Sequence, residues 1–163
     1  MKRIVAAVLV VMFMASPLFA AGGSLGSFEA YDFSDNRVTS AVFGDYDVTM
    51  INFFTTSCVY CMCEIQSLSA VKNALPARAN VIAVCADAYD LTEALDDVVG
   101  NFPADFTVLK MTDRQLAAVP YLLGYPTTLF VDSEGNILKV IAGVPNHPTD
   151  TYIETVRSLL AKR

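Results

Sequence analysis

The chain is poor in positive charge and contains no tryptophan. Its 11 lysine and arginine residues face 17 aspartate and glutamate residues, which gives a formal net charge of −6 at pH 7. Nucleic acids and anionic membranes are bound through basic surfaces, so this balance argues against both as partners. The sequence also lacks internal repeats and low-complexity tracts. Its 163 residues suit one domain with a hydrophobic core and are few for two.

Residues that bind structural metals are also scarce, with four cysteines and one histidine in the chain. Cys58 and Cys61 are three positions apart, but a zinc site usually needs a second such pair of cysteines or histidines. Cys63, Cys85 and His147 do not supply one. We therefore expect no metal, and Cys58 and Cys61 form either a structural disulfide or a redox site. His147 is interpreted as a loop residue without a role.

The longest apolar run stands at the N-terminus. Lys2 and Arg3 precede it, and it ends in Pro17-Leu18-Phe19-Ala20, which is the order of a secretory signal peptide. We expect residues 1–20 to be this signal peptide. The alternative is an uncleaved membrane anchor, because the run is about long enough to span a bilayer.

Export would place the cysteines in an oxidising compartment such as the periplasm. Without Lys2 and Arg3, the 11 basic residues become 9 against 17 acidic ones, a formal charge of −8. Residues 21–27 are rich in glycine and serine, and we expect them to be a spacer before the domain at residues 28–163.

Hydrophobic periodicity predicts strands alternating with helices. Strands are expected at residues 28–33, 37–39, 48–54, 80–86, 106–109, 127–132 and 137–142, and helices at 59–75, 91–99, 113–119 and 148–162. The near-continuous apolar runs at 48–54 and 80–86 are typical of strands covered on both faces. This pattern predicts an α/β fold, with a central mixed sheet flanked by helices and an N-terminal hairpin.

The strand at 48–54 leads directly to three of the four cysteines. Cys58 and Cys61 would stand at the start of the following helix, where their spacing permits a small disulfide ring. Free backbone N–H groups and the positive helix end stabilise a thiolate at that position. We therefore predict that Cys58 attacks and that Cys61 resolves the mixed disulfide.

A second motif, Gly124-Tyr125-Pro126-Thr127-Thr128, opens the strand near residue 127. Together with the cysteine pair after a buried strand, it resembles the thioredoxin superfamily. Within it, the chain is most similar to exported thiol-disulfide oxidoreductases of the TlpA/ResA type. The run from Asn52 to Cys58 stands where that family has an Asn-Phe-Trp-Ala-Thr-Trp-Cys type of run. The residues from Pro126 to Asp132, with Gly135, match its proline loop and hairpin.

The resemblance covers roughly residues 28–161, and residues 86–125 correspond to the central insertion of the family. Two departures concern the redox site itself. No tryptophan precedes Cys58, and Val59 and Tyr60, between the cysteines, include no proline. We expect Tyr60 to shape access to the sulfurs.

The resemblance also implies roles for individual residues. Pro126 would follow a cis peptide bond and present the substrate, with Tyr125 and Thr127 flanking the disulfide. Glu64, about one helical turn after Cys61, would handle the proton of that thiol. The alternative for Glu64 is a solvated helix residue.

The function implied by the resemblance is reduction of selected protein disulfides by dithiol exchange, without a cofactor. Its substrates would be proteins with thiols or disulfides, including haem-binding cysteines during cytochrome c maturation. Electrons would come from a membrane-bound partner, and we expect a monomer. The pKa of the attacking thiol sets the direction of exchange and does not follow from the residues between the cysteines, so an oxidant or isomerase stays an alternative.

Two other functions on the same fold stay open. Cys58 and Cys61, with Met62 or Cys63, have the soft ligands of a Cu(I)-handling protein. A thiol peroxidase is suggested by Thr55, three residues before Cys58, although the proline and arginine that complete such a site are not evident. The remaining cysteines, Cys63 and Cys85, suggest a second disulfide, whose geometry the sequence does not reveal.

Overall fold

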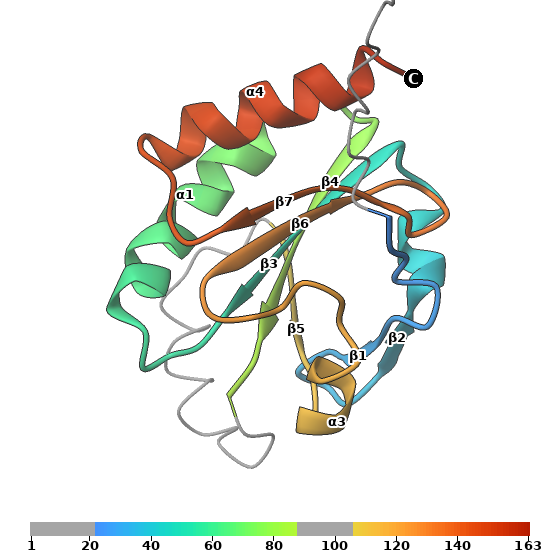
Figure 1. Ribbon diagram of the computed structural model, residues 1–163, viewed down its shortest axis with the longest axis vertical. Coiled ribbons are helices and arrows are strands. Elements are labelled where there is room, and N and C mark those ends of the chain that lie inside the picture. Colours follow the sequence, from blue (N-terminus) through green and yellow to red (C-terminus); the bar gives the residue numbers. More distant parts are fainter. Residues whose placement is uncertain (1–21, 88–105) are drawn as a thin grey trace, which may run out of the picture.

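The computed structural model describes residues 22–87 and 106–163, which form a seven-stranded mixed sheet between two hydrophobic layers (Figure 1). The strands follow the order β2-β1-β5-β4-β3-β6-β7. They are β1 (Glu29–Tyr31), β2 (Arg37–Thr39), β3 (Val48–Phe54), β4 (Ala79–Cys85), β5 (Thr107–Lys110), β6 (Thr127–Val131) and β7 (Ile137–Ala142). β3 lies between parallel β4 and antiparallel β6, and all seven of its residues are buried. The prediction of a mixed α/β sheet is confirmed.

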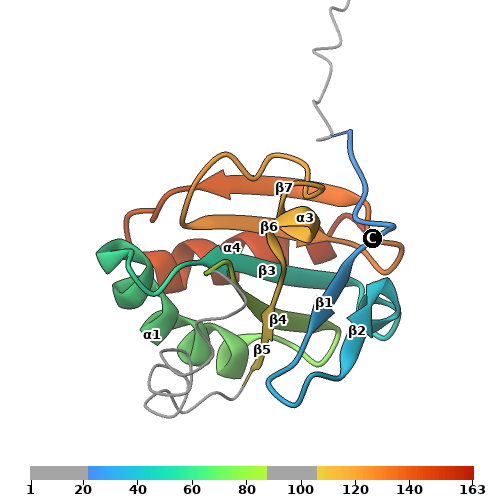
Figure 2. The ribbon, with the colours of Figure 1, turned by 90° about the horizontal axis from the view of Figure 1, so that it is seen from below.

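The long helices α1 (Val59–Ala74) and α4 (Pro148–Leu160) lie side by side on one face of the sheet (Figures 1 and 2). Their buried residues share a hydrophobic layer with every second residue of β3, including Met50 and Phe54. The alternate residues, including Ile51 and Phe53, face the other layer. This alternation follows from the two-residue period of a strand. Two shorter helices, η1 (Ser40–Phe43) and α3 (Asp113–Leu116), contribute to that second layer.

Two turns repeat the same aspartate-based hydrogen bonding. In the β6–β7 turn, Asp132 Oδ1 accepts from the backbone N–H groups of Glu134 and Asn136, and Oδ2 accepts from the Asn136 amide. Asp32 accepts from Ser34 and Asn36 in the same way between β1 and β2. Aspartate favours such turns because its side chain replaces a backbone acceptor. Both predicted hairpins are therefore closed by local hydrogen bonds.

The segment expected to be a spacer is in contact with the domain. Leu25 is buried, and its N–H donates to the carbonyl of Gly135 at 2.7 Å. The N–H of Ile137 in turn donates to the carbonyl of Gly23 at 2.9 Å. Residues 23–25 thus lie along the β6–β7 turn.

Most predicted boundaries are accurate to one or two residues. The exception is α3, which ends at Leu116, although helix was predicted to residue 119. Its Thr112 and Gln115 form a capping box, and Pro120 follows closely. The predicted signal peptide and the predicted helix at 91–99 lie outside the described residues. Among the residues that are described, no helix is long and apolar enough to cross a membrane.

Candidate active site

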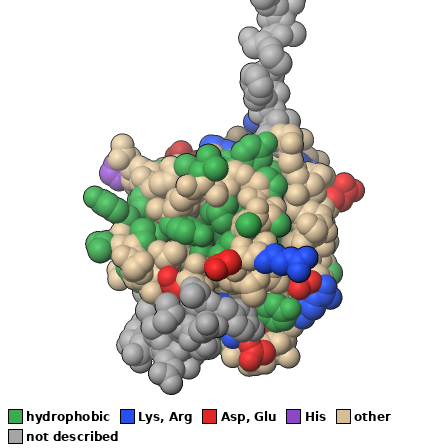
Figure 3. Space-filling view, turned by 60° about the horizontal axis from the view of Figure 1, so that its bottom comes forward, with side chains coloured by type: hydrophobic (Ala, Val, Ile, Leu, Met, Phe, Trp, Pro, Cys, Tyr) green, Lys and Arg blue, Asp and Glu red, His purple; other side chains and the backbone are tan. Residues whose placement is uncertain are grey.

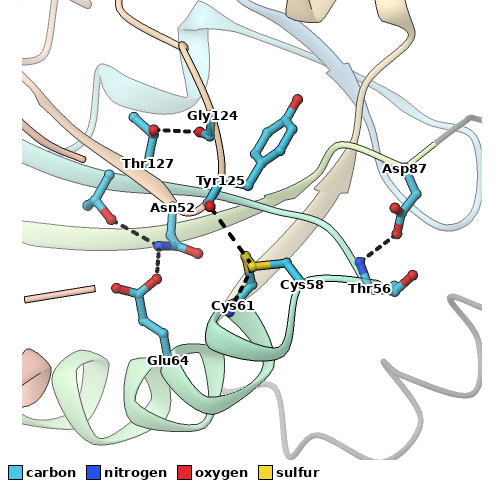
Figure 4. The surroundings of a disulfide bond; sticks show 10 residues. Asn52, Thr56, Cys58, Cys61, Glu64, Asp87, Gly124, Tyr125 and Thr127 are labelled. Atoms are coloured by element: carbon cyan, nitrogen blue, oxygen red, sulfur yellow. Dashed lines mark hydrogen bonds between the residues drawn. A yellow bond between two sulfur atoms is a disulfide. The ribbon is translucent and has the colours of Figure 1, made fainter. Parts of the chain in front are cut away.

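A disulfide joins Cys58 and Cys61 at the start of α1 (Figure 4). Cys58 is the N-cap residue, and its Sγ accepts a hydrogen bond from the backbone N–H of Cys61 at 3.1 Å. Cys58 is partly exposed, whereas Cys61 is fully buried. The unpaired N–H groups and positive end of the helix favour negative charge on Cys58. The exposed sulfur thus lies at the helix start, where a thiolate is stabilised, and the attacking role of Cys58 stays a prediction.

The loop before β6 lies against this disulfide. The Tyr125–Pro126 peptide bond is cis, and the carbonyl oxygen of Tyr125 lies 4.0 Å from Cys58 Sγ. Pro126 is buried, and its carbonyl accepts from the N–H of Gly143 at 2.8 Å. The fold therefore brings two motifs almost seventy positions apart into contact, with Tyr125 at the surface beside the sulfur.

Thr127 does not flank the disulfide as expected. Its side chain is buried and donates to the carbonyl of Gly124 at 2.7 Å. Its backbone stands opposite Phe53 of β3 on one side and Ala142 of β7 on the other. An incoming chain cannot pair with a residue enclosed between two strands. The role that remains for Thr127 is to close the loop that carries Tyr125.

Asp87 holds the segment between β3 and the first cysteine. Its carboxylate accepts from the backbone N–H of Thr56 at 2.8 Å, as Figure 4 shows. The same oxygen lies 3.4 Å from Cys85 Sγ. Asp87 was not identified from the sequence, because a single aspartate after a strand carries no specific signal.

Glu64 belongs to a closed ring of buried polar side chains. The Tyr152 hydroxyl of α4 donates to Glu64 Oε1, and the Asn52 amide of β3 donates to Oε2 at 2.9 Å. Asn52 Nδ2 also donates to Thr128 Oγ1 of β6 at 2.9 Å. The Thr128 hydroxyl closes the ring by donating to Tyr152 at 3.2 Å. Glu64 is 1% exposed, so the alternative of a solvated helix residue is wrong.

Burial and hydrogen bonding act in opposite directions on this carboxyl group. Burial disfavours the charged form and raises the pKa of Glu64, while the hydrogen bonds from Tyr152 and Asn52 lower it; the net pKa is above the ordinary value. Burial also raises the pKa of Tyr152, and the neighbouring Glu64 raises it further. The phenol therefore stays protonated and serves as a donor.

The ring is only partly visible in the sequence. Asn52 is a polar residue inside an apolar strand, and Thr128 follows Pro126 by two positions. Tyr152 lies in the helix predicted at 148–162, but nothing in the sequence identifies it as the partner of Glu64. Such pairings across 88 positions carry no local signal.

The expected bridge between Cys63 and Cys85 is not formed, and both cysteines are free. Cys63 is exposed on α1, whereas Cys85 is buried at the end of β4. The buried side of α1 faces the sheet, and Cys63 lies on the opposite side of that helix. Burial raises the pKa of the Cys85 thiol to about 12. Cys85 is thus a small core residue rather than a reactive one.

Several exposed apolar side chains come from segments next to the disulfide. Within the described residues the exposed large apolar side chains are Val59, Tyr60, Tyr121, Leu123, Tyr125 and Val144. Two of them stand between the cysteines, three belong to the loop before Pro126, and Val144 follows the residue that bonds Pro126. Figure 3 shows this apolar face, where few charged side chains gather. The Tyr121 ring lies against Gly23 and Ile137, at the other end of β7 from Gly143. We therefore call the other five residues the apolar rim.

Tyr60 and His147 are both exposed. Tyr60 is 74% exposed beside the disulfide, a position from which it can contact a partner. His147 precedes α4 in a left-handed conformation and makes no side-chain capping bond. The described part of the chain contains no group of three or more histidine, cysteine or acidic residues suited to a metal ion.

Comparison with protein families matches residues 21–140 to the model of the AhpC/TSA family. No curated protein matches the sequence. Solved structures do match, and because their sequence identity to this chain is below 25%, they support the fold alone.

Three of these structures show the range of the fold. A secreted disulfide oxidoreductase of Mycobacterium tuberculosis, described as homologous to E. coli DsbE, is 22% identical with a TM-score of 0.65, covering 82% of this chain and 96% of its own. The exposed lipoprotein thioredoxin of Streptococcus pneumoniae is 17% identical with a TM-score of 0.68, covering 80% and 98%. Arabidopsis thaliana ScoI with copper bound is 17% identical with a TM-score of 0.66, covering 87% and 99%.

Proposed function

This chain belongs to the AhpC/TSA family of thioredoxin-fold thiol-disulfide oxidoreductases, and we propose that it is an exported reductase of selected protein disulfides. The observation that carries the proposal is the Cys58–Cys61 disulfide at a helix start, next to the Tyr125–Pro126 loop. Disulfide exchange needs one sulfur that a substrate can reach, and Cys58 is partly exposed at the helix start. A purely structural disulfide has no such need.

The reaction begins with the reduced protein. The thiolate of Cys58, stabilised by the start of α1, attacks one sulfur of a substrate disulfide and releases the other as a thiolate. Cys61 then attacks Cys58 Sγ, the mixed disulfide breaks, and the Cys58–Cys61 disulfide forms. The proton of Cys61 leaves with the released substrate thiolates, and two electrons pass to the substrate.

Glu64 assists this second step by influencing the proton of Cys61. Its position one turn after Cys61, its burial and its raised pKa support that role. Tyr125 at the surface, Pro126 behind it and Tyr60 between the cysteines supply the surface that receives the substrate. The substrate chain lies across the apolar rim, with Tyr125 offering its backbone.

The cellular setting is part of the proposal. Residues 1–20 are a signal peptide that directs the chain to the periplasm or an equivalent compartment, and a membrane-bound partner returns electrons to the Cys58–Cys61 pair. The protein acts as a monomer on substrate proteins and needs no cofactor. Haem-binding cysteines awaiting cytochrome c maturation are the substrate class that we propose.

Reduction of insulin disulfides with dithiothreitol tests the exchange activity. We expect the wild-type protein to accelerate precipitation of the insulin B chain and Cys58→Ser to lose that acceleration. Cys63→Ser is the matched control, because Cys63 lies on the same helix but outside the disulfide. Equal activity of wild type and Cys58→Ser would contradict the proposal.

The direction of transfer is tested by the reduction potential of the pair, measured against glutathione or dithiothreitol. A value near about −270 mV supports a reductase, whereas one near about −120 mV identifies an oxidant. One similar structure holds copper, so copper content is measured in the same preparations. Copper that is retained through purification and lost in Cys58→Ser would favour a copper-handling protein.

A further inference from the structure

Asn52 carries an unpaired acceptor at the centre of the molecule. Its side chain is fully buried in β3, and Nδ2 uses both of its hydrogens, one on Glu64 and one on Thr128. Its Oδ1 is buried and has no hydrogen-bond partner among the described residues. An unsatisfied buried carbonyl of this kind costs about 1–3 kcal/mol, so its retention calls for an explanation.

The orientation of the Asn52 amide follows from its partners. Glu64 Oε2 accepts from Nδ2, and turning the amide over would place Oδ1 against that carboxylate. Nδ2 also donates to Thr128 Oγ1, whose own hydrogen is directed to Tyr152. A buried oxygen facing the carboxylate would be repelled, so Oδ1 must point away from Glu64. Figure 4 shows Nδ2 facing Glu64 and Oδ1 on the side of the disulfide.

Reduction adds a hydrogen-bond donor on the side of the molecule toward which Asn52 Oδ1 points. In the disulfide neither sulfur carries a hydrogen, whereas reduced Cys61 is a buried thiol with one donor. We propose that Asn52 Oδ1 accepts the hydrogen bond of the reduced Cys61 thiol, and that Glu64 acts on Cys61 through Asn52 rather than by contact. Asn52 is then the group next to the reacting sulfur, and Glu64 is a positioning residue.

This arrangement separates the two thiols chemically. A hydrogen bond to Asn52 stabilises the protonated form of Cys61, whereas the backbone N–H donated to Cys58 Sγ stabilises a thiolate there. The outer sulfur is thereby ready to attack while the inner one keeps its proton until the mixed disulfide forms. The inference rests on the proposed dithiol exchange for its role, but the hydrogen bond itself is measurable without it.

The test is the NMR signal of the Asn52 side-chain amide, assigned in isotope-labelled protein. Reduction of the wild type is expected to move the Asn52 Cγ resonance downfield, because a hydrogen bond polarises the carbonyl. The variants are compared with the oxidised wild type. Cys61→Ser keeps a hydrogen-bond donor at position 61 and is expected to show the downfield Asn52 resonance. Cys61→Ala has no donor there and is expected to lack it. The Asn80 amide is the internal reference, since its oxygen already accepts from Lys72 at 3.0 Å.

Two further variants test the positioning by Glu64. Glu64→Gln keeps a carbonyl for Asn52 Nδ2 and is expected to preserve the reduction-induced shift, whereas Glu64→Leu removes the acceptor and is expected to diminish it. Equal Asn52 signals in Cys61→Ser and Cys61→Ala would overturn the hydrogen bond. A preserved shift in Glu64→Leu would overturn the positioning role.

Insulin reduction is measured on the same samples to separate the two proposals. If the wild type reduces insulin but the Asn52 signal is the same in Cys61→Ser and Cys61→Ala, the inference fails and the proposed function stands. If the signal responds to Cys61 but the wild type has no exchange activity, the proposed function fails, and with it the catalytic role of Asn52.

Discussion

Replacing Glu64 by glutamine should alter the pH dependence of stability. The folded state raises the pKa of Glu64 above 4.5, the ordinary value that we take for the unfolded chain. At pH values between the unfolded and the folded pKa of Glu64, this carboxyl group is protonated in the native protein and ionised in the unfolded chain. The free energy of unfolding of the wild type therefore falls as pH rises through this window and levels off above it. In Glu64→Gln the ionisable group is absent, so this fall in the free energy of unfolding should be absent too.

The size of the effect follows from the same linkage. Each pH unit between the unfolded and folded pKa values costs the wild type about 1.4 kcal/mol relative to the variant. Glutamine is tolerated because its oxygen can accept from Asn52 and its nitrogen can donate to Tyr152, whose hydroxyl then turns to Thr128. The comparison thus isolates the ionisation rather than the loss of the ring.

The wild type and Glu64→Gln, both oxidised, are unfolded with denaturant at a series of pH values from about pH 4 to about pH 8, and their free energies of unfolding are compared. The free energy of unfolding of Glu64→Gln minus that of the wild type should rise with pH and then reach a plateau. Glu154→Gln, on the exposed side of α4, is the control and should give a constant difference. A constant difference for Glu64→Gln as well would refute the reasoning.

Three other outcomes are expected. Tyr152→Phe removes a hydrogen bond to the Glu64 carboxylate and should raise the pKa of Glu64 further, as followed by carboxyl carbon NMR. An unchanged titration would contradict the ring. In the oxidised native protein, iodoacetamide should label Cys63 but not Cys85. The raised pKa of Cys85 leaves roughly a thousandfold less thiolate than an ordinary cysteine has. In denaturant, mass spectrometry should find both cysteines labelled. Failure to label either cysteine in denaturant would instead indicate a bridge between them. Asp132→Ala removes the acceptor of the β6–β7 turn and should lower the free energy of unfolding by about 1–3 kcal/mol at neutral pH. The folded state lowers the pKa of Asp132, so this loss of stability should shrink as the pH falls through that lowered pKa. A loss that did not change with pH would contradict a role for the charged carboxylate in the turn.

Much of the fold was predictable because its signals are local. The buried run at 48–54 predicted β3 with both ends correct, and the helix after it ends where Pro76 requires. Such runs report burial on both faces, which the sheet order confirms. The extent of α3 was overestimated, because a capping box starts a helix without setting its length.

The site was predictable in its sulfur chemistry and less so in its surroundings. The spacing of Cys58 and Cys61 and the Pro126 motif are short patterns whose geometry is dictated by neighbouring residues. The substrate contact assigned to Thr127 was wrong, because only the pairing of β6 on both sides shows that this residue is enclosed. The bridge expected between Cys63 and Cys85 was wrong for a similar reason, since the side of α1 that faces the sheet depends on packing.

The sequence by itself determined the order of strands and helices, the cysteine pair and the proline loop, because each depends on residues within a few positions. Tertiary structure decided the hydrogen-bond partners of Glu64. Glu64, Asn52, Thr128 and Tyr152 come from four different elements, and hydrogen bonds join them over separations of 12 to 88 residues. A buried carboxyl group can be held only where such distant donors converge, and that convergence is a property of the packed fold.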